Sequence, residues 1–524
     1  MKQLLFKYLK IDQVIQIQFV LSLVFGLFIT VFPFIFHPID WEDYSITFNG
    51  TWLMYNGYAP YTDFGIPTGI GSFIFPYLSF LLFGPNYNSL YIMQAIEHGL
   101  LIYACYLFFG TFIKSNVNKK LAFSITVIIL SLFVIFNVKA QFYNSEFLLF
   151  EIFSFVFVLR AIQAETKKGS IINSGLVALF VFLTLQVKQD YGVFNFLIIA
   201  IVLLLYTIKN KNFVQFITFV LCFCFFVGIF LYIVDWNQFI YWFNLGQSLG
   251  SNTGLFSKLK LCFEKNDAIT LLVLIVIAVL LFLRQRTKEN AFYIFPLIII
   301  VGFGVQNILT LTTSNFPYLN YAVAFLVATV LIQLFILIKV NFRALLTVNF
   351  ALLIFLYLNL NQVFKSIYYF HPNGLLGTKA MTEKSRFKAM GISRNYKSNG
   401  ADFQYCINLI DAVYKVKKAP LCIANFTSLP VEMEVPTRRI KGLPLWPDNN
   451  VLLFEKEKQL YLNLLEKKQF DLIFILELDF SGYNFTNKEF KEEAFENYKI
   501  AKRFGLTYYN DSRQIVVLEK KTQI

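Results

Sequence analysis

The feature that most constrains this chain is a series of long apolar segments that recurs from the N-terminal region to about residue 360. A helix needs roughly 20 predominantly apolar residues to cross the hydrocarbon core of a bilayer. The composition agrees with a chain whose main solvent is lipid. It is 57% hydrophobic and 15% charged, whereas a soluble domain is about 45–50% apolar and about 25% charged. A large soluble enzyme is therefore excluded.

The apolar segments predict about eleven membrane-spanning helices. Their approximate bounds are residues 14–36, 90–113, 121–138, 147–160, 172–187, 193–208, 213–234, 268–283, 291–311, 322–338 and 344–360. One further apolar stretch, residues 69–83, is short and contains Gly and Pro. We predict a re-entrant or interfacial helix there, because counting it as a full span would invert the orientation of every later segment.

The positive charges predict the orientation of these segments. Lys and Arg cluster between alternate spans, as in the pair Lys119 and Lys120, whereas residues 37–89 contain neither. Positively charged residues tend to stay on the cytoplasmic side. We therefore expect a cytoplasmic N-terminus and an external loop at residues 37–89. The net charge of +14 is explained by cytoplasmic loops and does not indicate nucleic-acid binding.

The composition changes after about residue 361, where charges become frequent. Short apolar runs at residues 421–424, 472–476 and 515–518 predict strands, and residues 455–468 have helical spacing of Leu and Tyr. The fold class that we predict is a polytopic α-helical membrane protein with a small external α/β domain. The boundaries are residues 1–361 for the membrane domain and residues 362–524 for the external domain.

The external loop at residues 37–89 carries the strongest chemical signal. Asp40, Glu42 and Asp43 lie within four residues of one another. Mutual repulsion and reduced hydration near a membrane both raise carboxyl pKa values, and such a group can serve as a general base toward a hydroxyl. A structural alternative is an acidic loop that only avoids positive charge. The sequence Gly-Tyr-Ala-Pro-Tyr-Thr-Asp-Phe follows at residues 57–64, beginning fourteen residues after Asp43.

This arrangement resembles the GT-C glycosyltransferases, chiefly over residues 1–340. The resemblance rests on the acidic residues after the first span, the Gly57–Phe64 stretch and the Pro/Gly-rich entry to an interfacial helix. It implies a polyprenyl-phosphate-linked sugar donor, as used by protein mannosyltransferases and aminoarabinose transferases. The acceptor would be a glycolipid, a polysaccharide or a protein, and the location a bacterial inner membrane with the C-terminal domain outside.

The resemblance also implies roles for individual residues. Asp43 occupies the position of the catalytic base, although family members usually show Asp-Glu there and this chain has Asp43-Tyr44. Glu42 and Asp40 are therefore substitutes. Glu146, in the next external loop, matches a second acidic residue that orients the acceptor or holds a metal. Its alternative is a solvated residue at a helix start.

The lipid phosphate of the donor requires a cation or hydrogen-bond donors. Lys188 with Gln189 matches a Lys-Gln pair of related transferases, and Lys139 lies at another outer helix end. Their alternative is a lysine that reaches the interface with its charged end. Tyr61 and Asp63, inside the Gly57–Phe64 stretch, are expected substrate contacts. A divalent cation, Mg²⁺ or Mn²⁺, is a further possibility.

Two other functions compete with this one. An O-antigen polymerase or ligase also spans the membrane many times but works through arginines and a histidine in large external loops. A transporter would use Glu97, His98 and Glu151, which lie within expected spans, because ionisable residues inside a membrane face a protein interior or a wet cavity. In a glycosyltransferase, the same three residues would line the donor cavity or hold helices together.

Overall fold

The computed structural model contains two compact units. We call residues 1–32, 95–230 and 250–366 the helical unit, and residues 33–94, 231–249 and 367–524 the mixed unit. The structure describes residues 13, 16–24, 26–27, 43–66, 69–85, 87–113, 116–136, 142–241, 267–285, 292, 294–310, 317–337, 421–424, 443–444, 455–478, 488–508 and 511–521. Each unit is described by itself below.

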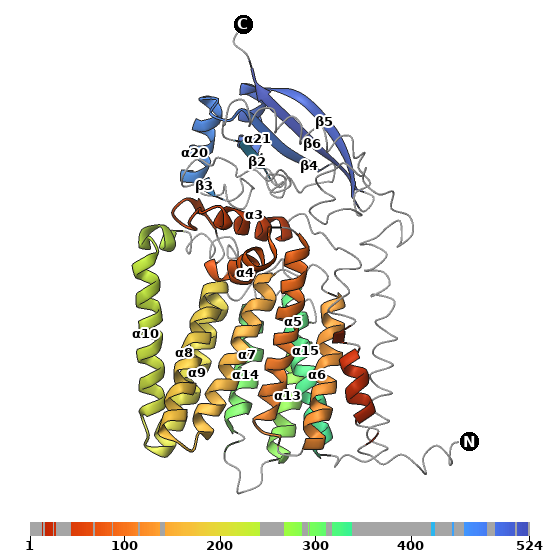
Figure 1. Cartoon of the computed structure of the whole chain (residues 1–524), viewed down its shortest axis with the longest axis vertical. Coiled ribbons are helices and arrows are strands. Elements are labelled where there is room, and N and C mark those ends of the chain that lie inside the picture. The colour runs from red at the N-terminus through yellow and green to blue at the C-terminus, as the bar shows by residue number, and fades with distance from the viewer. Residues whose placement is uncertain are drawn as a thin grey trace, which may run out of the picture. The chain divides into compact units, whose positions relative to one another are not determined.

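Long helices that lie side by side form the helical unit (Figure 1). Helix α5, Tyr87–Gly110, begins in the mixed unit and continues into the helical unit. The others are α6 (Asn116–Phe136), α7 (Phe142–Gln163), α8 (Lys167–Val187), α9 (Gln189–Asn210), α10 (Val214–Ile233), α13 (Asp267–Gln285), α14 (Ile294–Leu309) and α15 (Pro317–Leu337).

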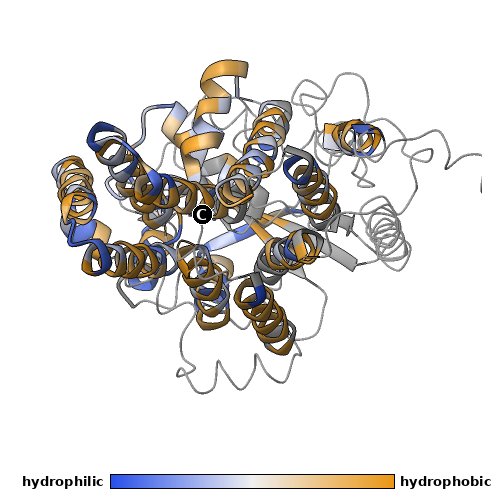
Figure 2. Cartoon of the chain, turned by 90° about the horizontal axis from the view of Figure 1, so that it is seen from below, coloured by the Kyte–Doolittle hydropathy of each residue, from blue (hydrophilic) through white to orange (hydrophobic). Residues whose placement is uncertain are grey.

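These helices are apolar over most of their length, as Figure 2 shows. Four described helical segments are long and apolar enough to cross a membrane, judged by length and composition: Ser89–Gly110, Lys167–Val187, Gln189–Asn210 and Val214–Ile233. The helices predicted between residues 90 and 338 are confirmed as helices. The expected span at 344–360 and much of that at 14–36 lie outside the described residues, so the number of spans stays a prediction.

Aromatic side chains fill the interior of the helical unit. The Phe325 ring of α15 lies 5.5 Å from that of Phe108 on α5 and 5.1 Å from that of Phe303 on α14. The Phe303 ring in turn meets Phe155 of α7 edge-on at 6.2 Å. Since lipid offers no hydrophobic drive for helices to associate, such van der Waals packing contributes most of the attraction between them.

Helices α8 and α9 join through a single residue, Lys188. Its N–H donates to the Thr184 carbonyl at 2.9 Å, and its own carbonyl accepts from the Gly192 N–H at 2.8 Å. One residue thus both ends the first helix and precedes the second. Because only one residue connects the two helices, the packing of α8 against α9 determines the position of Lys188.

The first described element of the mixed unit is α3 (Asp43–Tyr55), a helix that the sequence pattern did not predict. It packs on the short helix η1 (Ile70–Phe73) and on α4 (Ile74–Phe83). The two latter helices confirm the short helix expected at residues 69–83. A buried cluster of Leu53, Tyr61, Phe64, Ile66 and Phe73 joins these segments, and Val234, Phe239 and Tyr241 pack against it.

The C-terminal part of the mixed unit contains a four-stranded sheet in the order β2-β4-β6-β5. Strand β2 (Leu421–Ala424) runs parallel to β4 (Leu472–Leu478). Strands β5 (Tyr498–Tyr508) and β6 (Asp511–Lys520) form an antiparallel hairpin, and β6 also pairs antiparallel with β4. The three predicted strands and the helix predicted at 455–468, observed as α20 (Glu455–Glu466), are confirmed.

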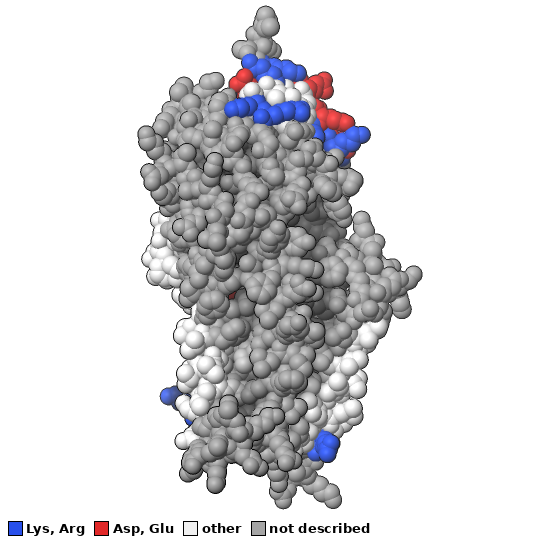
Figure 3. All heavy atoms as spheres, turned by 90° about the vertical axis from the view of Figure 1, so that its right-hand side faces the viewer, with Lys and Arg blue, Asp and Glu red and all other residues white. Residues whose placement is uncertain are grey.

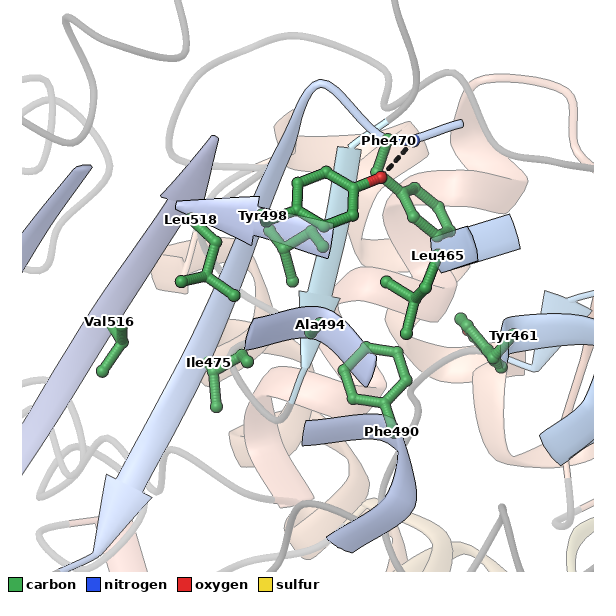
Figure 4. Packing of buried hydrophobic residues seen from close by; sticks show 10 residues of the cluster. Tyr461, Leu465, Phe470, Ile475, Phe490, Ala494, Tyr498, Val516 and Leu518 are labelled. Carbon is green, nitrogen blue, oxygen red and sulfur yellow. Dashed lines mark hydrogen bonds between the residues drawn. The ribbon is translucent and has the colours of Figure 1, made fainter. Parts of the chain in front are cut away.

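Apolar residues from α20, the sheet and α21 (Lys488–Asn497) form the core of this region (Figure 4). Tyr461, Leu465 and Phe490 are at most 3% exposed. The hydroxyl of Tyr498 accepts a hydrogen bond from the Phe470 N–H at 3.3 Å. The outer surface is charged, and Figure 3 shows basic and acidic side chains interspersed near the C-terminus. Two ion pairs of this region are Lys458–Glu489 (3.0 Å) and Lys499–Glu519 (3.1 Å).

A second, two-stranded sheet links the two parts of the mixed unit. Strand β1 (Phe64–Gly65) pairs in parallel with β3 (Leu443–Pro444), with Phe64 opposite Leu443 and Gly65 opposite Pro444. Nothing in the sequence pattern predicted this contact.

Candidate functional site

The Gly57–Phe64 stretch folds into a compact turn after α3. Gly57 has φ +86°, a conformation that suits glycine, and its N–H donates to the Met54 carbonyl at 2.9 Å. Asp63 and Ala59 then form a reciprocal ring. The Asp63 N–H donates to the Ala59 carbonyl at 2.8 Å, and the Asp63 carboxylate accepts from the Ala59 N–H at 2.8 Å.

Tyr61 is the buried centre of this turn. It has φ +66° and is 2% exposed. Its N–H donates to the Phe64 carbonyl at 2.8 Å, and its ring meets that of Phe239 edge-on at 5.6 Å. Burial raises the pKa of its hydroxyl, which interacts with the backbone of Ile70. The turn thus accounts for the local geometry of Tyr61, and any contact of Tyr61 or Asp63 with substrate stays a proposal.

Asp43 is the first described residue of α3. The Asp43 side chain is not among the described ones. Glu42, Asp40 and Lys139 lie outside the described residues, so the prediction that they support or replace Asp43 and Lys188 stays a prediction.

Lys188 lies at the expected outer end of α8, and its surroundings are described in the structure. Its Nζ lies 4.8 Å from the centroid of the Tyr191 ring and 5.1 Å from that of Phe147. Burial lowers the pKa of Lys188 to about 7, and the opposing effect of Asp190 is smaller. Cation–π contacts of this kind favour the charged form by about 0.5–2 kcal/mol. The ammonium therefore lies against two aromatic rings in a partly buried position.

The aromatic contacts of Lys188 come from two helices, and the alternative of a lysine that reaches the interface stays open. The Phe147 and Tyr191 rings are themselves in contact, with centroids 4.2 Å apart, so α7 and α9 together form the aromatic surface under the ammonium. Gln189 is the first residue of α9. Asp190 is exposed, and its carboxylate accepts from the Tyr191 N–H at 2.9 Å. Lys188 thus lies at a helix N-terminus, which is a favourable place for an anion.

Glu146 precedes Phe147 on α7 and is fully buried, at 0% exposure. The interpretation as a solvated residue at a helix start is therefore wrong, because packing of α7 places this carboxyl inside the protein. Its neighbour Phe147 contacts Lys188. Glu146 thus belongs to the helical segment that holds the lysine, whereas its role toward an acceptor or a metal stays a proposal.

A second group of buried polar residues lies inside the helical unit. Ser154 of α7 donates to the Asn195 side-chain carbonyl at 3.0 Å, and the Asn195 amide donates to the Thr184 hydroxyl at 3.2 Å. Glu151 lies one turn before Ser154 on α7, and both Glu151 and Gln306 of α14 are fully buried. We call Glu151, Ser154, Thr184, Asn195 and Gln306 the polar seam.

The three ionisable residues expected inside spans are confirmed as interior. Glu97 and Glu151 are fully buried and His98 is 6% exposed. Ser154, Asn195 and Tyr191 were not predicted from the sequence. Small polar residues in an apolar helix were the available signal for the first two, because such side chains in lipid-facing positions are costly unless a neighbouring helix satisfies them. No sequence signal distinguished Tyr191 from the chain's many other aromatic residues.

Within the described ranges, no three His, Cys, Asp or Glu side chains come together as a metal site. The expectation of a divalent cation stays a prediction.

Comparisons with known proteins give the following findings. No protein-family profile and no curated protein matches the chain. Two crystal structures of ArnT from Cupriavidus metallidurans align with 95% of this chain and 97% of theirs. The structure bound to undecaprenyl phosphate is 10% identical with a TM-score of 0.46, and the apo structure is 11% identical with a TM-score of 0.49.

Proposed function

We propose that this chain is an integral membrane glycosyltransferase of the GT-C type. It moves a sugar from a polyprenyl-phosphate donor to a glycolipid, polysaccharide or protein acceptor at the outer face of a bacterial inner membrane. The apolar helices and the Gly57–Phe64 turn support this class of enzyme, and the turn is where the sequence resembles the family.

The environment of Lys188 carries the proposal. A partly buried ammonium, which lies against the rings of Phe147 and Tyr191 beside the first turn of α9, suits a phosphate group better than a neutral ligand. Because the pKa of Lys188 is lowered to about 7 by burial, a bound phosphate favours protonation and gains a charge-assisted hydrogen bond. Lys188, with Gln189 beside it, is the proposed contact to the lipid phosphate.

The proposed reaction is a direct displacement. The acceptor oxygen attacks the anomeric carbon, Asp43 takes the hydroxyl proton, and the bond from that carbon to the phosphate oxygen breaks. The electron pair leaves with the lipid phosphate, whose added negative charge the Lys188 ammonium stabilises. Attack opposite the leaving group inverts the anomeric centre. No step uses a divalent cation, which stays a separate expectation of the resemblance.

The test compares a deletion strain with its parent by mass spectrometry of surface glycans and lipid-linked sugars. We expect the deletion to remove one sugar from a surface glycan and to accumulate its lipid-linked donor, and the wild-type gene to restore both. Unchanged glycans and unchanged lipid-linked sugars would refute the proposal. Uptake or efflux that depends on Glu151, without any sugar transfer, would favour the transporter instead.

A further inference from the structure

Phe64 brings together three segments of the mixed unit that are remote in sequence. Its backbone, with that of Gly65, pairs with Leu443–Pro444. Its side chain is fully buried in the cluster that contains Leu53 of α3, against which Phe239 also packs. The conformation of the first external loop therefore depends on residues far along the chain.

The pairing partner belongs to the C-terminal part of the chain. Strand β3 lies between β2 and α20 in the sequence, and β2 is an edge strand of the four-stranded sheet. Both β1 and β3 have only two residues. An isolated two-stranded pairing is marginally stable at best, so each strand relies on the domain or cluster behind it. The C-terminal domain is thus part of what holds the Gly57–Phe64 turn.

The turn is connected to α3 at short range. The Tyr58 N–H donates to the Leu53 carbonyl at 3.0 Å, and Leu53 and Phe64 share one buried cluster. A helix transmits displacement along its length because its backbone is held by successive hydrogen bonds. Movement of Phe64 would therefore move α3, which begins at Asp43.

We infer that the β1–β3 pairing is a positioning device, by which the C-terminal domain holds the first external loop in the conformation that presents Asp43 for reaction. This inference rests on the proposed function. Leu443 is then a positioning residue, since it acts through Phe64 and α3 and touches no reacting atom. The role assigned to the C-terminal domain is to complete the active loop.

The first test changes only the pairing. In the full-length protein, Leu443→Pro removes a main-chain N–H next to Pro444, which already has none. We expect kcat to fall about 10- to 100-fold, as a misplacement of about 1 Å can cause, while the KM for the donor stays within about twofold of wild type. Leu443→Ala keeps the N–H and is the matched control, with an expected kcat within about threefold of wild type. If the β1–β3 pairing only stabilised the fold, Leu443→Pro would lower the amount of active protein. The remaining active protein would then keep the wild-type kcat and KM.

The second test reads the loop conformation without any activity. With the six native cysteines replaced, Ile66→Cys introduces a thiol at a position that is 1% exposed. We expect the thiol to resist a water-soluble maleimide, and to react at least about tenfold faster when Leu443→Pro is added. Thr62→Cys, at an exposed position of the same turn, serves as the control that labels equally in both backgrounds. Continued protection at residue 66 in the Leu443→Pro protein overturns the inference.

A covalent link tests the same contact without a disruptive substitution. Gly65 and Pro444 are paired Cα partners, so oxidation of Gly65→Cys/Pro444→Cys should join them and leave kcat within about threefold of its reduced value. Absence of the cross-link also overturns the inference. If labelling and cross-linking behave as expected but no form transfers sugar, the proposed function fails and the pairing stands. If Leu443→Pro exposes the thiol yet transfers at the wild-type rate, the positioning role fails alone.

Discussion

Gly192 of α9 lies directly against Leu185 of α8, close enough that a Cβ on Gly192 would lie 2.5 Å from the Leu185 nitrogen and closer still to its Cα. Backbone atoms cannot yield in the way that the end of a flexible side chain can. The one-residue turn at Lys188 therefore depends on glycine at position 192, and the lysine's position depends on that close approach.

Gly192→Ala is expected to destabilise the protein by about 1–3 kcal/mol, the usual cost of overpacking, and to weaken donor binding by shifting Lys188. Thermal unfolding in detergent and a donor-binding titration measure the two effects. Gly228→Ala on α10, where an added Cβ meets nothing within 4 Å, is the matched control. It should be neutral or stabilising by up to about 1 kcal/mol. Equal stability of the two variants would contradict the close approach.

Asp43→Asn is expected to lower the rate of sugar transfer at least about 100-fold, because general-base catalysis contributes about 10²–10⁴. Donor affinity should stay near wild type, since the amide keeps the shape of the carboxyl group. Radiolabelled transfer by the purified protein in lipid measures the rate.

The control for Asp43→Asn is Asp235→Asn. Asp235 is an exposed acid whose carboxylate accepts from the Asn237 N–H at 3.0 Å, and the amide oxygen of Asn can accept the same bond. A wild-type rate in Asp43→Asn would show that another group, with Glu42 and Asp40 the first to test, takes the proton.

Donor binding should weaken as pH rises through about 7. The proposed phosphate contact needs the Lys188 ammonium, and burial lowers the pKa of this group to about 7 in the free protein. Between pH 6 and pH 8 its protonated fraction falls about tenfold, and so should the affinity for a lipid phosphate. The titration is done in the Asp43→Asn protein, so that turnover does not interfere.

Lys188→Arg tests whether the pH dependence of donor binding comes from residue 188 or from another titrating group. Arginine stays protonated over the whole range, so its affinity should be nearly independent of pH between 6 and 8. Lys188→Gln should bind the donor at least about tenfold more weakly at pH 6. A wild-type slope in Lys188→Arg would assign the pH dependence to a different group.

The polar seam should show measurable coupling between helices. In a double-mutant cycle of Ser154→Ala and Asn195→Ala, the interaction energy is expected to be about 0.6 kcal/mol, typical of hydrogen bonds between membrane helices. Unfolding in mixed micelles measures it. Thr207→Ala serves as a comparison on α9, outside the seam, and its effect should be additive with Ser154→Ala to within about 0.5 kcal/mol. If the effects of Ser154→Ala and Asn195→Ala on stability were additive, the hydrogen bond between these two side chains would not stabilise the helix packing.

Some of the candidate site followed from sequence because its signals are local. The apolar run that ends before Lys188 predicted a helix end at that position, and the structure has α8 ending at Val187. The Gly57–Phe64 stretch was identified from its residues, but its turn conformation was not predicted. Helix length depends on a run of neighbouring residues, so a helix end can be predicted from a short window.

Other parts were not predictable from the sequence. Nothing near Glu146 signalled complete burial, since the solvated helix start was an equally good interpretation of the same residues. Helix α3 was missed because its sequence, which contains Asp43, Asn49 and Gly50, lacks a clear apolar stripe. Helix α3 packs against α4 and η1. The spacing of apolar residues within α3 does not indicate these contacts.

The sequence by itself determined which segments are apolar enough for lipid, where three of the C-terminal strands lie, and which carboxylates and lysines are available for chemistry. These are properties of residue type and short-range order. Only the tertiary structure placed Phe64 opposite Leu443 and seated the Lys188 ammonium over Phe147 and Tyr191. Contacts between distant segments depend on which surfaces bury one another most favourably, and that choice leaves no periodic pattern in either segment.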